Sequence, residues 1–204
     1  VRAAAIATMA SSVALGLVLV YSRGTTLLYI GLAGLGGAWF YTAPPLMLKY
    51  RALGEPLVFL MMGPLMIGGA ALAATGVIPP GVWLASIPVG LLVTAVLNAN
   101  NVRDVEDDRQ RGVRTLVNLT SHGTGKVQYA LFLLGAYASV PALAVAGVLP
   151  WWCMLAWLTL PLGLKQVVAV MRSTVRSFPE MGVERTAQLH LLFGVLLVVG
   201  LFIG

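Results

Sequence analysis

Two carboxylates in the middle of the chain carry the strongest chemical signal. Asp104 and Asp108 follow an apolar stretch and stand four residues apart. If a helix continues from that stretch, both side chains lie on one face, with their Cβ atoms about 5–6 Å apart. Paired carboxylates suit Mg²⁺, a hard cation that takes oxygen ligands and often shares them with substrate phosphates. The same spacing is common on exposed helices, so a solvated run of charges is an equally good interpretation.

Amides and arginines surround this pair of carboxylates. Asn100 and Asn101 precede the pair by about one turn and can add amide oxygens or hydrogen bonds. Guanidinium groups bind phosphate oxygens, bidentately where the geometry allows. Residues 98–116 are therefore a candidate site for a metal-bound phosphate. The cations available in this stretch are Arg103, Arg109, Arg111 and Arg114.

A second stretch, residues 41–55, combines a helix stop with two cations. Pro44 and Pro45 end a helix, and the chain then passes through a short basic loop. Lys49 and Arg51 in this loop can pair with a diphosphate or with anionic lipid headgroups. The alternative is that these cations only set the membrane topology, and the residues taken alone favour that alternative.

The elements that must position these groups are membrane helices. The chain has 204 residues, of which 59% are hydrophobic and 10% charged, and its mean hydropathy is +0.91. Soluble domains carry about 25% charged residues, so the composition excludes a water-soluble globular protein. The net charge of +6, without a low-complexity basic arm, favours a membrane protein with cationic loops over a nucleic-acid binder. The single cysteine, Cys153, excludes an internal disulfide.

Seven apolar stretches are long enough to cross a bilayer, which takes about 20 residues for a helix. No strand-like alternation separates them, and the hydrocarbon core admits only helices or closed barrels. We therefore expect an all-α, polytopic transmembrane bundle that forms one domain over residues 1–204. The expected spans are 3–20, 26–44, 56–75, 82–98, 127–148, 151–171 and 186–203.

Threading these spans alternately through the membrane separates the charges. Eleven of the 13 Lys and Arg residues fall on one side, with all seven acidic residues, and Arg23 alone falls on the other. The positive-inside rule places the charged side in the cytoplasm. The remaining cation, Lys165, lies within the sixth span. It either snorkels to the interface or lines the site.

Both chemical stretches resemble motifs of the UbiA superfamily of membrane prenyltransferases, most closely its menaquinone branch. That branch typically shows Tyr-Ser-x-Pro-Pro-x-x-Leu-x-Tyr-Arg-Gly-Leu-Gly-Glu, which residues 41–55 nearly reproduce. It also shows Asn-Asn-x-Arg-Asp-x-x-x-Asp-Arg-x-x-Gly-Lys-x-Thr-Leu, which residues 100–116 match except at Val113, where the lysine is replaced. Residues 186–194 resemble the family's last helix, so the resemblance covers essentially the whole chain.

This resemblance implies a reaction and a set of roles. Family members transfer a polyprenyl chain from a polyprenyl diphosphate to an aromatic acceptor. In the menaquinone branch the acceptor is 1,4-dihydroxy-2-naphthoate, which loses CO₂ and yields demethylmenaquinone. The implied Mg²⁺ ligands are Asp104 and Asp108, with Asn101 and Arg103 as catalytic supports. The implied substrate contacts are Lys49, Arg51, Arg114, Tyr41 and Asn100, and Lys165 is a further candidate because it is an ionisable residue within a span.

The resemblance also implies a location and shows one large departure. It implies an integral protein of the bacterial plasma membrane, with the site on the cytoplasmic face, membrane lipid around it and no nucleic-acid partner. Family members have nine spans and two Asp-rich motifs, whereas this sequence has seven expected spans and the second motif only. Its first span resembles the family's third helix, and the chain begins at Val1. We therefore expect an amino-terminally truncated form of the domain, with a reduced homologue as the alternative.

Three other functions compete with this interpretation. A different aromatic acceptor, such as 4-hydroxybenzoate or homogentisate, would leave the motifs unchanged. A non-catalytic lipid-binding or transport protein would explain the bundle and its basic face, but not the detailed pattern of residues 100–116. A retinal-binding photoreceptor needs a carboxylate at membrane depth, and no expected span contains Asp or Glu.

Overall fold

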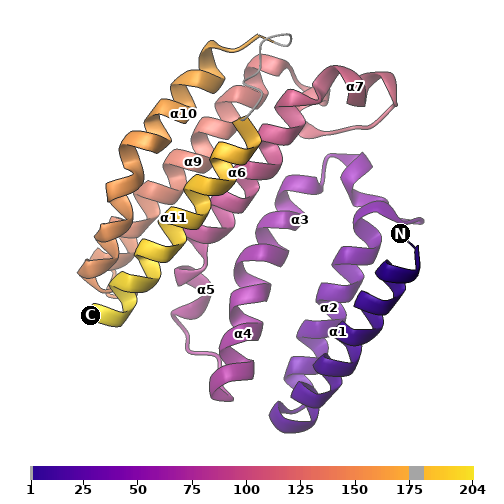
Figure 1. Cartoon of the computed structure of the whole chain (residues 1–204), viewed down its shortest axis with the longest axis vertical. Helices are drawn as coiled ribbons and strands as arrows, with labels where there is room; N and C mark the ends of the chain where they lie inside the picture. Colours follow the sequence, from indigo (N-terminus) through magenta and orange to yellow (C-terminus); the bar gives the residue numbers. More distant parts are fainter. Residues whose placement is uncertain (1, 175–181) are drawn as a thin grey trace.

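The protein is a bundle of membrane-length helices (Figure 1). The structure is a computed structural model that describes residues 2–174 and 182–204, and these ranges contain no strand. The elements in chain order are α1 Arg2–Arg23, α2 Thr25–Thr42, η1 Leu48–Arg51, α3 Gly54–Leu60, η2 Met61–Leu65, α4 Met66–Thr75, α5 Val82–Ala85, α6 Ile87–Arg103, α7 Val105–Gln110, α8 Leu116–Leu119, α9 His122–Val145, η3 Trp151–Thr159, α10 Leu160–Arg172 and α11 Gly182–Ile203.

The predicted all-α transmembrane bundle is confirmed. Within the described residues, six helical stretches have the length and apolar composition to cross a membrane, and each corresponds to a predicted span. The remaining predicted span, 26–44, is the 18-residue helix α2, whose glycines, threonines and tyrosines lower its hydropathy. The largest boundary differences are five residues. They occur where α6 continues to Arg103 and where α9 begins at His122.

Helices α6, α9, α10 and α11, with η3, form the tightly packed part of the molecule, which we call the packed half. Its core contains the fully buried side chains of Leu133 and Phe193. Polar side chains also join the helices: the hydroxyls of Tyr129 and Thr186 are hydrogen-bonded at 2.9 Å, across α9 and α11. Interhelical hydrogen bonds of this kind stabilise membrane bundles, because a lone polar group in hydrocarbon has no water to bind.

Small residues bring the helices of the packed half into backbone contact. A Cβ atom at Gly200 would lie 2.6 Å from the Cα atom of Cys153, so α11 lies directly on η3. A Cβ atom at Gly163 would lie 2.9 Å from the ring of Tyr137, so the backbone of α10 lies directly on a side chain of α9. Packing between small residues is a main source of helix association in membranes. The arrangement of this half is therefore fixed by its sequence at particular glycines.

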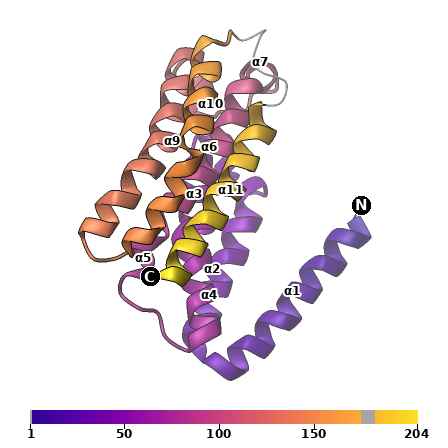
Figure 2. The ribbon, with the colours of Figure 1, turned by 60° about the vertical axis from the view of Figure 1, so that its left-hand side comes forward.

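The amino-terminal helices α1, α2 and the continuous helix α3–η2–α4 form the open half. Figure 2 shows α1 leaning away from the rest of the bundle. Within the described part of α1, only Gly16 and Val20 are even partly covered. Arg23 at its end donates hydrogen bonds of 2.8 and 3.0 Å to the carbonyls of Ala73 and Ala74. It thereby satisfies carbonyls that the end of α4 leaves without a helical partner.

The two halves meet where the helix α3–η2–α4 packs on α6. Pro64 lies inside this helix, and residues Met61–Leu65 around it take the π-helical form. Proline lacks the N–H that a regular α-helical turn needs, which explains the local π-helical form. At the same level, a Cβ atom at Gly63 would lie 3.0 Å from the Cα atom of Gly90. This backbone contact holds η2 against the first turn of α6.

The loop with Lys49 and Arg51 and the charged residues of 104–114 lie at one end of the bundle. In Figure 1 this end carries α7, and the carboxyl terminus lies at the opposite end. We call it the charged end and define it by residues 43–53 and 104–121. One of the cations predicted for this side, Arg176, falls outside the described residues. At the opposite end Trp83 and Trp151 are exposed, as interfacial tryptophans are.

Candidate functional site

Asp104 and Asp108 lie on consecutive turns at the charged end. Asp104 ends α6 and α7 begins with the next residue, but the backbone N–H of Asp108 still donates to the carbonyl of Asp104 at 2.8 Å. The helical path therefore continues through the boundary between the two elements. The two residues are thus joined by a helical hydrogen bond across the boundary, and a common face for their carboxylates stays a prediction.

The carboxylate of Asp104 is held by Arg103. The Nε atom of Arg103 donates to Oδ1 of Asp104 at 2.7 Å, and Nη2 donates to Oδ2 at 2.9 Å. The same Nη2 donates to Oδ1 of Asn100 at 2.6 Å. The guanidinium thus fixes the rotamer of Asp104 and is itself fixed by the amide one turn earlier. Because a carboxylate oxygen can accept more than one hydrogen bond, this clamp leaves Asp104 with acceptor capacity.

Asp108 is partly buried, and its environment differs from that of Asp104. Burial raises the pKa of its carboxyl above the usual value, and the positive charges of Lys49 and Arg111 oppose this rise. Asp104 and Asp107 add to it, because a neighbouring negative charge disfavours ionisation. Lys49 belongs to η1, which is more than fifty residues earlier in the sequence. The fold therefore brings the basic loop close enough for its charge to act on the acidic motif.

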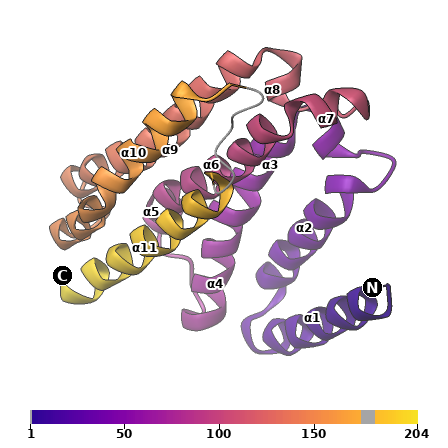
Figure 3. The ribbon, with the colours of Figure 1, turned by 45° about the horizontal axis from the view of Figure 1, so that its top comes forward.

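Two hydrogen bonds join the stretches 41–55 and 100–116. The backbone N–H of Ala52 donates to the carbonyl of Arg114 at 2.7 Å. Nδ2 of Asn101 donates to Oε1 of Glu55 at 2.9 Å, and both side chains are buried. One bond joins the loops and the other joins the start of α3 to the end of α6. Together they make the two stretches a single structural unit, and Figure 3 shows α7 beside the loop that joins α2 to α3.

Glu55 is the residue of this unit that the sequence analysis did not select. Its side chain is 1% exposed, and Oε2 has no hydrogen-bond partner among the described residues. A buried carboxylate is costly unless it is hydrogen-bonded, so its position beside Asn101 points to a role in the site. The sequence does contain a signal for Glu55. This acidic residue lies directly before an apolar span, where a charge that only sets the membrane topology would be a Lys or Arg.

The other predicted substrate contacts lie at different distances from this unit. Arg51 donates to the carbonyl of Pro45 at 3.1 Å, which holds its side chain over the loop. Arg114 contributes its backbone carbonyl and has an exposed side chain. Lys165 is exposed on α10, a helix whose neighbours are α9, α11 and η3. The structure therefore does not bring Lys165 together with the acidic motif.

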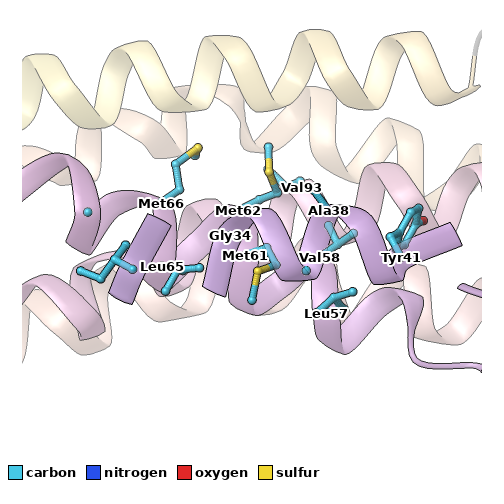
Figure 4. Close-up of a pocket in the computed structure, with 13 residues that line it drawn as sticks. Gly34, Ala38, Tyr41, Leu57, Val58, Met61, Met62, Leu65, Met66 and Val93 are labelled. Carbon is cyan, nitrogen blue, oxygen red and sulfur yellow. The ribbon is translucent and has the colours of Figure 1, made fainter. Parts of the chain in front are cut away.

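Tyr41 links the charged end to an apolar cavity. The cavity has a volume of about 730 Å³ and lies between α2 and the helix α3–η2–α4. Figure 4 shows Tyr41 at one end of the row of lining side chains and Met66 toward the other. The ring of Tyr41 lies beside Gly54 at the start of α3, where a Cβ atom would be 3.9 Å from its hydroxyl. The walls are otherwise apolar: Ile30, Gly34, Gly37, Ala38, Leu57, Val58, Met61, Met62, Leu65, Met66, Gly69 and Val93.

The donor set at the charged end fits Mg²⁺ in part. No group of three or more His, Cys, Asp or Glu side chains in the described ranges is arranged to hold a metal ion. Asp104 and Asp108 supply two carboxylates, and Mg²⁺ is commonly held by one or two carboxylates together with water and substrate phosphates. The residues present therefore suit a metal that arrives with a diphosphate, rather than one enclosed by protein ligands.

Comparison with known proteins agrees with these motifs. A model of the UbiA prenyltransferase family matches residues 1–189. The 1,4-dihydroxy-2-naphthoate octaprenyltransferase of Bacillus subtilis is 30% identical over 200 residues, which are 98% of this chain and 64% of the relative. The enzyme of the same description from Haemophilus influenzae is 32% identical over 175 residues, which cover 86% of this chain and 57% of the relative.

An animal protein is also similar to this chain. The UbiA prenyltransferase domain-containing protein 1 homolog of Drosophila melanogaster is 31% identical over 175 residues, or 85% of this chain and 46% of the relative. The chain thus spans between 46% and 64% of the length of these three relatives. The match to the family model includes both stretches of the candidate site.

Proposed function

We propose, since this chain belongs to the UbiA prenyltransferase family, that it transfers a polyprenyl chain from a polyprenyl diphosphate to 1,4-dihydroxy-2-naphthoate. The observation that carries the proposal is the junction at Tyr41, where the acidic motif and the basic loop meet the mouth of an apolar cavity. A prenyl diphosphate has a head with several negative charges and a long apolar tail, and this junction offers matching surroundings for both. The names of the two bacterial relatives support the choice of acceptor.

The cations of the loop would bind the diphosphate. Lys49 acts on Asp108 by its charge, and Arg51 is held over the same loop by the carbonyl of Pro45. Arg114 follows the motif on a segment that is bonded to Ala52. Positive groups aimed at the diphosphate stabilise the charge that builds up as it leaves. Asp104 and Asp108 would hold Mg²⁺, which supplies further stabilisation of that leaving group.

The clamp on Asp104 would keep the acidic motif ready for this ligand. Arg103 fixes the carboxylate from one side, and Asn100 fixes Arg103. Asn101 ties the same helix end to Glu55. A site whose groups are already oriented loses less entropy when the substrate binds. Asn100, Asn101 and Arg103 are therefore proposed as supports of the two carboxylates.

The apolar cavity would hold the tail and keep water away from the reacting carbon. The allylic C–O bond breaks and the diphosphate keeps its electron pair, while a carbon of the aromatic ring supplies the pair for the new C–C bond. The acceptor then releases its carboxylate as CO₂, and the electron pair of the broken C–C bond stays on the ring and restores its aromaticity. Exclusion of water prevents hydrolysis of the activated donor. Tyr41, at the mouth of the cavity, would contact the acceptor or the first part of the tail.

The protein would act as an integral protein of a bacterial plasma membrane, with the charged end in the cytoplasm. The excess of Lys and Arg at that end supports this orientation. The tail and the surrounding lipid would share the apolar surface of the open half. The implied partners are small molecules and membrane lipid, without a nucleic acid.

The test is an acceptor comparison in membranes from cells that express the protein from its own gene. We expect Mg²⁺-dependent prenylation of 1,4-dihydroxy-2-naphthoate and release of labelled CO₂ from its carboxyl group. Preferred prenylation of 4-hydroxybenzoate or homogentisate, measured as a higher kcat/KM, would reassign the acceptor. Binding of the prenyl diphosphate without transfer to any of the three acceptors would instead favour a lipid-binding protein.

A further inference from the structure

A second apolar cavity continues beyond the far end of the first. It has a volume of about 410 Å³ and lies between α1, α2 and α4. Its lining includes Gly16 and Val20 of α1, and the two cavities share Ile30 of α2 and Gly69 of α4. The open half therefore contains two chambers that meet at one pair of residues.

The contact between these two residues separates the chambers. A Cβ atom at Gly69 would lie 3.0 Å from Cγ2 of Ile30, so the side chain of Ile30 rests directly on the backbone of α4. Glycine permits this approach because it has no side chain of its own. Ile30 is only partly buried, and α1 beyond it is exposed over most of its length. The barrier is thus one aliphatic side chain rather than a packed core.

The distance from the charged end to this barrier sets a length. Tyr41 and Ile30 lie eleven residues apart on α2, which corresponds to about 16 Å along the helix. An extended isoprenoid tail gains about 4–5 Å per unit, from four backbone bonds of roughly 1.5 Å each. The first chamber therefore accommodates about three to four isoprene units before the tail reaches Ile30.

The chemistry of the second chamber favours a chain without a polar group. Ser12 is the one polar residue on its wall, and no charged side chain lines either chamber. A headgroup in the second chamber would lose its hydration without gaining a partner, which is costly. An isoprenoid tail that enters from the charged end presents only apolar carbon at this depth.

We propose that Ile30 and Gly69 form a gate that determines how long an isoprenoid donor the protein uses. Donors of about three units end before the gate. Longer donors pass between Ile30 and Gly69 and place their distal units in the second chamber, against α1. This inference rests on the proposed prenyl transfer and adds a specificity-determining pair to it.

The test measures kcat/KM for farnesyl diphosphate, with three units, and octaprenyl diphosphate, with eight. Ile30→Ala widens the gate, and Ile30→Phe blocks it. A single methylene in an apolar pocket changes kcat/KM by about 10-fold or more. We therefore expect the octaprenyl-to-farnesyl ratio to rise at least about tenfold in Ile30→Ala and to fall by as much in Ile30→Phe.

A matched control separates the gate from a general effect of a smaller side chain. Leu131 on α9 is 66% exposed and lines neither chamber, so Leu131→Ala should leave the ratio unchanged. Equal loss of both donors in the Ile30 variants would indicate a structural effect and would overturn the gate. An unchanged ratio, in a protein whose transfer still depends on Asp108, would overturn the gate and leave the proposed function standing. Absence of transfer with either donor would overturn both.

Photolabelling identifies what occupies the second chamber. An octaprenyl diphosphate with a photoreactive group on its last unit should label the segment of α1 that contains Gly16 and Val20, and the farnesyl analogue should not. Ile30→Phe should abolish this label. Labelling of the same segment by a photoreactive phospholipid, undiminished by excess octaprenyl diphosphate, would show a lipid acyl chain there and would overturn the proposal.

Discussion

In the packed half, one continuous core of buried side chains runs through α6, α9, η3 and α11. In the described part of α1 and α2, by contrast, Leu27 is the only buried side chain. The acidic motif follows directly after α6, so the packed core determines its position. The basic loop and both apolar chambers belong to the open half. The difference indicates that the two halves have different roles. The packed half holds the reacting groups in place, and the open half accommodates an apolar ligand.

Three of the close contacts between the two halves are a backbone contact and two hydrogen bonds. Gly63 lies on Gly90 in the middle of the bundle. Asn101 donates to Glu55, and Ala52 donates to Arg114, at the charged end. A change at one of these places should therefore affect activity differently from a change deep within either half. The predictions below use this expectation, and they begin with the largest effect.

Replacement of Asp108 by Asn should lower the rate of prenyl transfer by about 10²–10³-fold, as loss of one group that stabilises a transition-state charge does. The variant should remain inserted in the membrane, because Asp108 is outside the packed core. The rate is measured in membranes with saturating prenyl diphosphate. Asp107→Asn is the matched control, since Asp107 is adjacent and exposed. A similar loss in the control would mean that total negative charge, rather than the carboxylate of Asp108, is required.

Replacement of Gly200 by Ala should destabilise the packed half by about 1–3 kcal/mol, the usual cost of an overfilled contact. The new methyl group would meet backbone atoms of η3, at 2.5 Å from the carbonyl oxygen of Trp152, and backbone cannot rotate away. Gly36→Ala in the open half is the control, because a Cβ atom there meets nothing within 4 Å. Stability is measured as the midpoint temperature for loss of monodisperse protein in detergent. Equal sensitivity at the two positions would contradict the distinction between the halves.

Much of the fold could be predicted from the sequence, because apolar length and charge placement are local properties. The seven spans follow from them, and the one-turn spacing of Asp104 and Asp108 follows from their four-residue separation. The contacts between halves could not be predicted in this way. Nothing in the sequence distinguishes Gly63 and Gly90 from other glycines, because their contact exists only in the folded chain. The π-helical turn at Pro64 depends on the helices that pack around it. Glu55 was missed for the same reason, since its partner Asn101 is 46 residues away.

Replacement of Glu55 by Leu should lower activity by about tenfold, because Asn101 would lose a hydrogen bond to a charged acceptor, which is worth about 1.5–3 kcal/mol. Glu55→Gln keeps a carbonyl oxygen for Asn101 and should lose less than about threefold. The comparison uses kcat and KM measured for both variants, with Glu106→Gln as the exposed control. If Gln is as harmful as Leu, the negative charge of Glu55 is required, and the tether to α6 is not its main role.

Replacement of Lys49 by Met should weaken binding of the diphosphate and, more specifically, shift the pH dependence of transfer. Burial raises the pKa of Asp108, and the positive charge of Lys49 counteracts this rise. Loss of that charge therefore raises the pKa of Asp108 further. If the ionised carboxylate is the active form, activity falls as the pH drops through this pKa, and the acid limb of the profile must move to higher pH in the variant.

The profile of kcat/KM against pH measures this limb, and two other variants make it decisive. Lys49→Arg keeps the positive charge and should restore the original limb. Arg109→Met removes a cation from the same helix as Asp108, but Arg109 is exposed and pairs with Glu106 at 3.3 Å, so the limb should not move. An acid limb that stays in place in Lys49→Met, or moves to lower pH, would mean that the basic loop does not act on Asp108. The two halves would then contribute to catalysis separately, and the loop of the open half would serve only to bind the diphosphate.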